Sequence, residues 1–571
     1  MQSGGGEEEE DYIKKIPTIL LLKIINYVDD NVDLVCLLLS CKRLFNFTTP
    51  SAAVNYHLSF KHIEYKNPKS NHYINNINAY YSKKCYHLKS FKKMFTNTFS
   101  DTMIIRDKKN HGRDDSNNII ATAIVLEEYK DDSMELSLGI PQSTTSLTLH
   151  QPIRKPLPAD FRFPPLLNHL TIHYETQEAI EKCNGLPDSL RSLTLLIESQ
   201  NFPNKILPAG LERLDLYMGS NFYIEPRRLG LDTLTSLTWL RTYSIADKED
   251  TKYCTLPKSL TYLKTEMEDI PSSPTYFRPL VHLVHLYLEI LDPDLNNDTF
   301  GFIPSSVKTL ELHMNPQSAN PNEKQPIPDN VESLTLTGYN VSQFDKLPNS
   351  IKKLVIKDFQ VSNDSLPTIT LPNNLQEFKW IHQNQSIKPP PLQFIYPSTL
   401  KHIDYSLLEQ PYKQPIPQSI TEFKYRVSTT TNHNTKIHII GRDDGDGLIF
   451  PSTLIKLSIY INRQVNDRWI FRFDHLINQS NIDQLVIFGN DINFQVDIRR
   501  LDPENRNVLI LGKSLYGGII HQQIEQQMKD NGGDDHQYQY QPIYLCFGSG
   551  NTPPKLKFNL STKIVYKFVD N

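Results

Sequence analysis

A ten-residue pattern recurs along most of this chain and restricts its fold more than any other feature. Residues 327–336 are one clear copy and read apolar, Pro, any residue, small polar, apolar, any two residues, Leu, any residue, apolar. Leu334 and Leu336 are two residues apart, so in a β-strand they point to the same face. Pro328 has a fixed φ and no N–H, which excludes it from a helix interior and from a central strand ladder. Each copy therefore predicts an extended proline segment, a bend at Val331 and a short strand.

The copies are regularly spaced. Most prolines of the clear copies stand 20 to 25 residues apart, at positions 141, 164, 187, 208, 257, 304, 328, 348, 372, 397, 417 and 451. Two steps are about twice as long, and a degenerate copy fills each gap, at residues 231–239 and 280–288. Another degenerate copy, at residues 482–487, follows the last clear one. This regularity predicts about fifteen stacked units between residues 140 and 490.

A single unit is too small to fold alone. Three or four buried apolar side chains contribute roughly 6–10 kcal/mol, at about 2 kcal/mol each. Ordering the backbone of roughly 22 residues costs about 1–2 kcal/mol per residue. Each unit must therefore bury its apolar face against neighbours on both sides, as in a solenoid. We expect a repeat solenoid with a parallel β-sheet to which each unit adds one strand.

The repeat core resembles two known repeat families. Its Leu-x-x-Leu-x-Leu segment is similar to the leucine-rich repeat, and the full core with its proline and small polar residue is more similar to FNIP repeats. Phe344-Asp345, ahead of Leu347-Pro348, resembles the leading Phe-Asn of FNIP repeats, which most copies here lack. The asparagine of leucine-rich repeats is present only at positions 315, 462 and 490, so we do not expect a continuous asparagine ladder. The resemblance implies a leucine-rich-repeat-like stack.

The residue between the two apolar strand positions should point away from the core, and it varies between copies. This row contains Thr194, Asp215, Glu311, Thr335, Val355, Lys379, Asp404 and Lys424. The mixture favours a protein-binding surface over a nucleic-acid track, and a merely solvated face is the alternative. The net charge of −4 and the pI near 6.5 give no global attraction to nucleic acid or an anionic membrane.

Residues 12–49 differ in character from the repeats. Pro17 fits the first turn of a helix. Apolar residues follow it at helical spacing: Leu20, Leu21, Ile24 and Val28. Asp33 can cap a second helix that contains Leu34. The segment closes with Ser-Cys-Lys-Arg-Leu-Phe at residues 40–45.

This segment resembles the F-box over about 35 residues. The positions that match the F-box pattern are Pro17, Leu20, Leu21, Ile24, Tyr27, Asp33, Leu34, Cys41, Lys42 and Arg43. Ile19, in place of an acidic residue, and Leu44-Phe45, in place of the aromatic close, depart from it. An F-box followed by FNIP repeats is a known combination. The alternative is a small helical cap over the first repeat.

The F-box resemblance implies a role in ubiquitin transfer. It implies that residues 12–49 bind the Skp-type linker subunit of a cullin–RING (SCF-type) ubiquitin ligase and that the solenoid holds a target protein. The residues implied in linker binding are Pro17, Leu20, Leu21, Ile24 and Leu34. The alternative function is a non-catalytic protein–protein interaction scaffold in which the N-terminal helices only cap the stack.

The remaining segments carry fewer signals. Residues 1–11 form an acidic tail that we expect to be disordered, residues 50–139 a connector and N-terminal cap, and residues 491–571 a C-terminal cap. We expect strands at 119–127, 134–138, 543–547 and 563–568, a helix at 522–529 and a polar loop at 530–541. An insertion at 429–447 lengthens one repeat step to 34 residues and should form a loop.

Catalytic motifs are missing from the sequence. We find no nucleotide-binding, kinase or hydrolase signature, so we expect no enzyme, no cofactor and no metal site. Cys546 has no acid–base partner nearby, which argues against a cysteine-dependent ligase. The six cysteines form no Cys-x-x-Cys and predict free thiols in a reducing compartment. With no apolar run of membrane length, we expect a cytoplasmic protein, or a nuclear one, with no membrane or nucleic-acid partner.

Overall fold

The computed structural model divides into two compact units, unit 1 with residues 1–99 and 409–571, and unit 2 with residues 100–408. The described residues are 16–28, 31–48, 102–105, 123–126, 142–153, 162–174, 186–197, 207–218, 229–244, 256–267, 277–290, 303–314, 327–338, 347–358, 368–381, 393–406, 415–427, 437–440, 450–461, 468–489, 493–512, 517–528, 537–547, 555–557 and 565–567.

Unit 2 consists of short strands. Its elements are β1 (Thr102–Ile105), β2 (Ala123–Leu126), β3 (Ser146–Ile153), β4 (His169–Tyr174), β5 (Ser192–Ile197), β6 (Arg213–Met218), η4 (Leu231–Thr233), β7 (Trp239–Ser244), β8 (Tyr262–Met267), β9 (His285–Ile290), β10 (Thr309–Met314), β11 (Ser333–Thr337), β12 (Lys353–Lys357), β13 (Thr368–Thr370), β14 (Glu377–Ile381), β15 (Gln393–Ile395) and β16 (His402–Ser406).

Unit 1 contains the described helices of the N-terminal segment and the strands of the C-terminal region. Its elements are α2 (Thr18–Tyr27), α3 (Asn31–Leu39), α4 (Lys42–Phe45), η1 (Asn46–Thr48), β17 (Glu422–Val427), β18 (Ile437–Ile440), β19 (Lys456–Ile461), β20 (Arg468–Arg472), α9 (Phe473–Asn478), β21 (Gln484–Gly489), β22 (Asn493–Arg500), β23 (Asn507–Gly512), β24 (Gly517–His521), β25 (Ile524–Met528), β26 (Gln537–Tyr540), β27 (Tyr544–Phe547), β28 (Lys555–Lys557) and β29 (Val565–Lys567).

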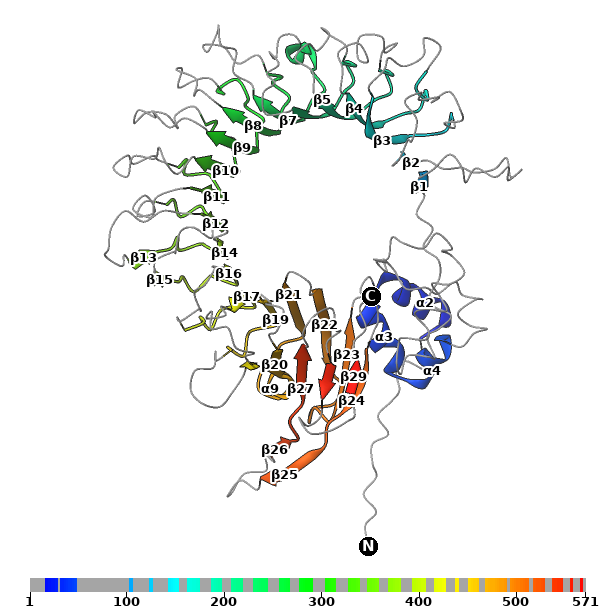
Figure 1. Ribbon diagram of the computed structural model, residues 1–571, viewed down its shortest axis with the longest axis vertical. Helices are drawn as coiled ribbons and strands as arrows, with labels where there is room; N and C mark the ends of the chain where they lie inside the picture. Colours follow the sequence, from blue (N-terminus) through cyan, green and yellow to red (C-terminus); the bar gives the residue numbers. More distant parts are fainter. Residues whose placement is uncertain are drawn as a thin grey trace, which may run out of the picture. The chain divides into compact units, whose positions relative to one another are not determined.

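Unit 2 is a parallel β-solenoid of leucine-rich-repeat type. Neighbouring strands pair in parallel from β1 to β12 and on to β14 and β16. The register places Leu334 opposite Leu310 on one side and Leu354 on the other, and all three are fully buried. The strands line the concave side of an arc, and the parallel pair β13 and β15 lies outside it (Figure 1). The predicted solenoid with a parallel sheet is confirmed.

The proline position opens a turn in each repeat, as the pattern predicts. The N–H of Val331 donates to the carbonyl of Pro328 at 3.1 Å, which closes the bend ahead of β11. The next two backbone amides, of Glu332 and Ser333, donate to the backbone carbonyl of Lys308 in the preceding repeat, at 2.8 and 3.0 Å. Val331 itself is fully buried. The turn therefore directs the following strand into register with its neighbour.

The small polar residue of the pattern has a role that the sequence did not reveal. In five described repeats its side chain donates to the carbonyl of the apolar turn residue one repeat earlier, whereas Ser306 and Ser419 in the same position form no such bond. The bonds are Ser189 Oγ to Leu167 at 2.8 Å, Ser259 Oγ to Leu237 at 2.7 Å, Ser350 Oγ to Val331 at 2.7 Å, Thr399 Oγ1 to Leu375 at 2.8 Å and Thr453 Oγ1 to Ile420 at 2.8 Å. These hydroxyls join consecutive repeats at the turn that precedes each strand.

The degenerate copies also form strands. The two that fill the long proline steps lead into β7 and β9, which pair in parallel with β8 between them. The last degenerate copy leads into β21, which pairs in parallel with β19. The predicted copies at 280–288 and 482–487 are confirmed. The copy at 231–239, predicted with Leu231 in the proline position, is present but shifted by three residues, because Leu234 and Leu237 form the turn and Leu240 is the strand residue in register with Leu263.

Unit 1 changes from parallel to antiparallel pairing. β17, β19 and β21 are parallel repeat strands, and β21, β22, β23 and β24 then pair antiparallel in that order. A second sheet joins β18 and β20 in parallel and continues antiparallel through β27, β28 and β29. Phe494 of β22 meets Phe547 of β27 edge-on at 5.7 Å, so the two sheets share a core.

Outside the repeats, the observed secondary structure matches the expected one only in part. The helix expected at 522–529 is wrong, because Ile524–Met528 is strand β25, paired antiparallel with β26. β26 also lies within the expected loop at 530–541, and β18 within the expected insertion loop. Strands were found within 119–127, 543–547 and 563–568 as expected, whereas 134–138 lies outside the described residues.

Candidate functional site

The helical segment of unit 1 is the first candidate surface. Pro17 is the N-cap of α2, and α3 begins at Asn31, so Asp33 lies within its first turn and not at its cap. Two of the residues implied in linker binding, Leu21 and Leu34, are buried in the core that the helices share. The other three, Pro17, Leu20 and Ile24, are exposed.

The outer face of α2 carries four apolar side chains that no described residue covers, and Lys23 lies among them. Ile19 is 67% exposed, Leu20 and Ile24 are each 47% exposed, and Tyr27 is 83% exposed. We call these four residues the α2 stripe. A surface helix normally presents polar residues to solvent, and an exposed apolar patch often marks an interaction site.

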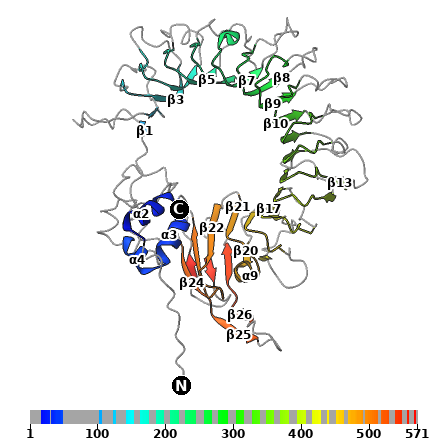
Figure 2. The ribbon, with the colours of Figure 1, turned by 180° about the vertical axis from the view of Figure 1, so that it is seen from behind.

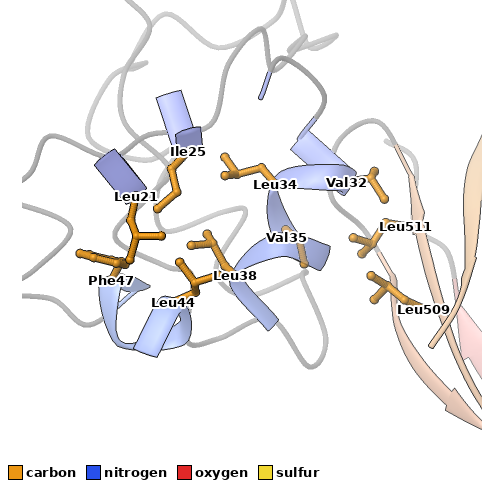
Figure 3. Packing of buried hydrophobic residues seen from close by; sticks show 10 residues of the cluster. All are labelled: Leu21, Ile25, Val32, Leu34, Val35, Leu38, Leu44, Phe47, Leu509 and Leu511. Atoms are coloured by element: carbon orange, nitrogen blue, oxygen red, sulfur yellow. The ribbon is translucent and has the colours of Figure 1, made fainter. Parts of the chain in front are cut away.

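The opposite side of the helical segment packs on the C-terminal sheet. Val32 and Val35 of α3 point toward Leu509 and Leu511 of β23 (Figure 3). Beside this contact, Arg499 of β22 donates to Asp33 Oδ1 through Nη2 at 3.0 Å and Nε at 3.3 Å. Both views of the ribbon place α3 next to this sheet (Figure 2). The helices are therefore held on one face of the C-terminal sheet.

The strand face of unit 2 is the second candidate surface. Aromatic and cationic side chains gather on four neighbouring strands. This β6–β9 patch consists of Arg213, Tyr217, Trp239, Arg241, Tyr262, Lys264 and Tyr287. Among the described strand-face residues of β3–β5 and β10–β16, none is Phe, Tyr or Trp.

The first row of the β6–β9 patch is a stack of flat groups. The Arg213 guanidinium lies 3.7 Å from the centroid of the Trp239 ring. Trp239 stacks on Tyr262, with centroids 4.7 Å apart and an interplanar angle of 10°. The ring centroid of Tyr262 lies 6.2 Å from that of His285 on the next strand. The parallel register produces this row, because it sets Arg213, Trp239 and Tyr262 side by side on successive strands.

The second row combines charges with tyrosines. Arg241 Nε is 3.8 Å from Asp215 Oδ1. The Arg241 guanidinium also lies 4.2 Å from the centroid of the Tyr217 ring and donates to its hydroxyl. Lys264 Nζ is 3.8 Å from the centroid of the Tyr287 ring. These are cation–π contacts, which strengthen as water is excluded.

Burial shifts the pKa values of this row. Desolvation raises the pKa of Asp215, although the nearby Arg241 opposes the shift. Desolvation and then the positive charge of Arg241 lower the pKa of Lys264. Desolvation, assisted by Glu289, raises the pKa of Tyr287 to about 12. The row is therefore an environment in which each charge is more costly than in water.

The charges of the surrounding face are distributed unevenly. Two carboxylates next to the patch have basic partners: Glu289 lies 3.4 Å from His313 and Glu311 lies 3.2 Å from Lys357. By contrast, Arg213 and Lys264 lie against aromatic rings and form no direct ion pair with any described residue, although Asp215, Glu289 and Glu311 are near enough to act on them electrostatically. Asp215 on β6 pairs with Arg241, so Arg213 and Lys264 are the cations of the patch without a paired carboxylate.

The predicted outward row lies on the strand face, but three of its members are buried: Asp215, Val355 and Asp404. At Asp215 the cause is visible, because the long side chain of Arg241 lies beside it. Sequence reasoning followed a single residue per repeat and so missed the patch. Comparing the first and second outward positions across consecutive repeats would have placed the aromatic and cationic residues on one surface.

Other features bear on chemistry and location. Among the described residues, no group of His, Cys, Asp and Glu side chains is arranged to hold a metal ion. Cys546 is half-buried in β27, opposite Ile470. Within the same described parts of the chain, no helix is long and apolar enough to cross a membrane.

Comparisons with known proteins concern the fold alone. No protein-family model matches the chain, and no curated protein matches it. The chain is similar to CroV588, a protein with a circular leucine-rich-repeat structure, at 17% identity over 66% of this chain and 57% of that chain, with a TM-score of 0.31. It is also similar to YopM from Yersinia enterocolitica WA-314, at 17% identity over 61% of this chain and 66% of that chain, with a TM-score of 0.31.

The chain therefore spans less than two thirds of the length of either protein. The leucine-rich-repeat-like architecture stands on the parallel ladder and the leucine register of the chain itself. The resemblances to FNIP repeats and to the F-box stay predictions.

Proposed function

We propose that this chain is the substrate-recognition adaptor of a cullin–RING ubiquitin ligase. The observation that carries the proposal is the α2 stripe, a set of exposed apolar side chains on a helix that buries Leu21 and Ile25 on its other side. Its members Leu20 and Ile24 are also two of the residues that the F-box resemblance assigns to linker binding. A Skp-type linker subunit would cover this stripe.

The solenoid would supply the second binding surface. Stacked repeats form extended concave surfaces that bind other proteins, and the strands of unit 2 line such a surface. An adaptor of this kind catalyses no step. It holds the target protein near the ubiquitin-loaded enzyme, and proximity accelerates the transfer. Such an adaptor would act in the cytoplasm or the nucleus.

Co-purification with a Skp-type linker subunit tests the proposal. The double variant Leu20→Asp/Ile24→Asp places two charges on the α2 stripe without entering the helical core. We expect it to lose linker binding while its circular dichroism and thermal unfolding stay close to those of the unsubstituted chain. The control is Lys42→Asp, an exposed position at the start of α4 and outside the stripe, and it should retain binding. A linker subunit that binds the double variant as well as the unsubstituted chain would exclude the adaptor role.

A second candidate function is an interaction scaffold whose helices only complete the C-terminal end. It is favoured by the packing of α3 on β23 and by the Arg499–Asp33 ion pair, which are contacts that a cap requires. In this case the unsubstituted chain binds no linker subunit, and deletion of residues 1–49 exposes Leu509 and Leu511 and causes aggregation. Of the two candidate functions, only the adaptor role requires the α2 stripe to bind a linker subunit.

A further inference from the structure

We propose that the β6–β9 patch binds an acidic segment of the partner protein, with an apolar or aromatic side chain of that segment resting on the Trp239–Tyr262 row. The inference rests on the proposed role of the solenoid in holding a target protein. The inference specifies which part of unit 2 binds the target and which kind of side chains the target presents. It is independent of whether the helical segment binds a linker subunit.

The composition of the patch is that of a binding hot spot. Trp, Tyr and Arg are the residues whose truncation most often costs binding energy at protein interfaces. The patch brings together Trp239, two arginines and three tyrosines on adjacent strands, whereas the described strand faces elsewhere in unit 2 carry no aromatic residue. Their mutual stacking holds these side chains in place before a partner arrives, which lowers the entropy cost of binding.

The charges select an acidic partner. Arg213 and Lys264 lie on aromatic rings and form no ion pair with a described residue, and Arg241 and Lys264 stand in register on neighbouring strands. Two adjacent cations in a partly desolvated row repel one another. A carboxylate placed above them would relieve this repulsion and provide the missing ion pairs. The partner is therefore expected to carry Asp or Glu side chains.

A nucleic acid fits the patch less well than an acidic protein segment. Cations and stacked aromatic rings also bind single-stranded nucleic acids. However, Asp215 lies within the second row, and Glu289 and Glu311 lie on the two strands that follow. Phosphates following the backbone at regular intervals would meet these carboxylates, whereas an acidic peptide can place a carboxylate beside Arg213 or Lys264 and an uncharged side chain beside Asp215.

Binding of defined probes to the full-length chain tests the inference. The probes are a fluorescently labelled peptide in which glutamate alternates with leucine, the corresponding peptide with lysine in place of glutamate, and a single-stranded oligothymidine. We expect the glutamate peptide to bind with an affinity that falls as salt is added. We expect the lysine peptide to show no saturable binding and the oligothymidine to bind more weakly than the glutamate peptide.

Two variants locate the binding site. Arg213→Ala/Lys264→Met should weaken binding of the glutamate peptide at least about fivefold, since truncation of a hot-spot residue typically has an effect of this size or larger. The Met side chain keeps the contact with the Tyr287 ring and removes only the charge. The charge-matched control is Lys308→Ala/Lys352→Ala, which removes two lysines that already pair with Glu332, and it should bind normally.

Three outcomes would overturn the inference: a glutamate peptide that does not bind, equal weakening in the patch and control variants, or tighter binding of the oligothymidine. None of these outcomes bears on linker binding by the α2 stripe. Conversely, a failed linker co-purification would leave the peptide result intact. The two proposals can therefore fail separately.

Discussion

At the scale of single residues, the hydrogen bond between repeats explains why a small polar residue recurs in the pattern, which the sequence shows but does not explain. The pattern shows that a small polar residue recurs two positions after the proline. Its acceptor lies in the preceding repeat, as with Ser350 and Val331. The pairing depends on how the repeats stack, so no local rule of sequence could assign it.

The chain provides a matched pair of serines for testing this role. Ser350 Oγ donates to the carbonyl of Val331 at 2.7 Å, whereas Ser306 Oγ, in the same position of another repeat, is buried without a hydrogen bond. Ser350→Ala should lower the free energy of unfolding of unit 2 by about 1 kcal/mol, because it leaves a turn carbonyl without its donor. Ser306→Ala should be neutral or slightly stabilising, since it removes a buried hydroxyl that has no partner.

Urea unfolding followed by far-ultraviolet circular dichroism measures both effects. A midpoint that falls for Ser350→Ala and not for Ser306→Ala supports the role of the hydroxyl bond between repeats. Equal shifts in the two variants would mean that the residue matters for its size and not for its hydrogen bond.

Residues 20–24 illustrate a second limit of sequence reasoning. Helical spacing correctly predicts α2 and its apolar residues. However, Leu20 and Leu21 are neighbours about 100° apart around the helix, and tertiary packing decided which of them is buried. Leu21 entered the shared core with Leu34, and Leu20 stayed outside. The set of linker-binding residues implied by resemblance therefore divides into a buried and an exposed part that sequence alone does not separate.

At the scale of elements, the attachment of the helical segment depends on contacts across almost the entire chain. Asp33 and Arg499 are 466 residues apart in sequence and meet in one ion pair. The strand β25 was mistaken for a helix for a related reason. Its Gln and Glu residues have good helix propensity, but antiparallel pairing with β26 outweighs that preference. In both cases a distant partner determines the local structure.

A charge swap tests the attachment of the helices. Asp33→Arg places a guanidinium against Arg499 and should loosen α3 from the C-terminal sheet. We expect amide hydrogen exchange in α3 to accelerate about fivefold, equivalent to about 1 kcal/mol, the upper range for a partly exposed ion pair. Exchange in β22 and β23 should change little. The double variant Asp33→Arg/Arg499→Asp should restore slow exchange in α3.

Hydrogen exchange with mass spectrometry resolves these segments. If exchange in α3 stays slow in Asp33→Arg, the apolar contact of Val32 with Leu511 holds the helix without the ion pair. If the double variant does not recover, the effect of Asp33→Arg lies within the helix and not at the contact with β22.

At the scale of the whole molecule, the repeat architecture was the part of the fold most accessible from sequence. The period, the strand positions and the degenerate copies depend on local patterns that the solenoid repeats, so a weak signal in one unit is reinforced by the next. The start and end of the stack carry no such repetition. The antiparallel order of β21–β24 and the packing of the helices on this sheet were therefore not predictable from the sequence. The β6–β9 patch was not predictable either, because it forms only when four strands pair in the observed register.

A stack of this kind should lose structure locally when one unit is damaged, because each repeat contacts mainly its neighbours. Leu334→Asp places a carboxylate between the buried Leu310 and Leu354 and should cost more than about 4 kcal/mol, a typical result of burying an unpaired charge. Hydrogen exchange should therefore accelerate most in β10, β11 and β12, while β4 and β5 keep their protection. The control Thr335→Asp adds the same charge one residue later, on the partly exposed strand face, and should leave exchange nearly unchanged. An equal loss of protection from β4 to β16 would instead mean that unit 2 unfolds as one cooperative block.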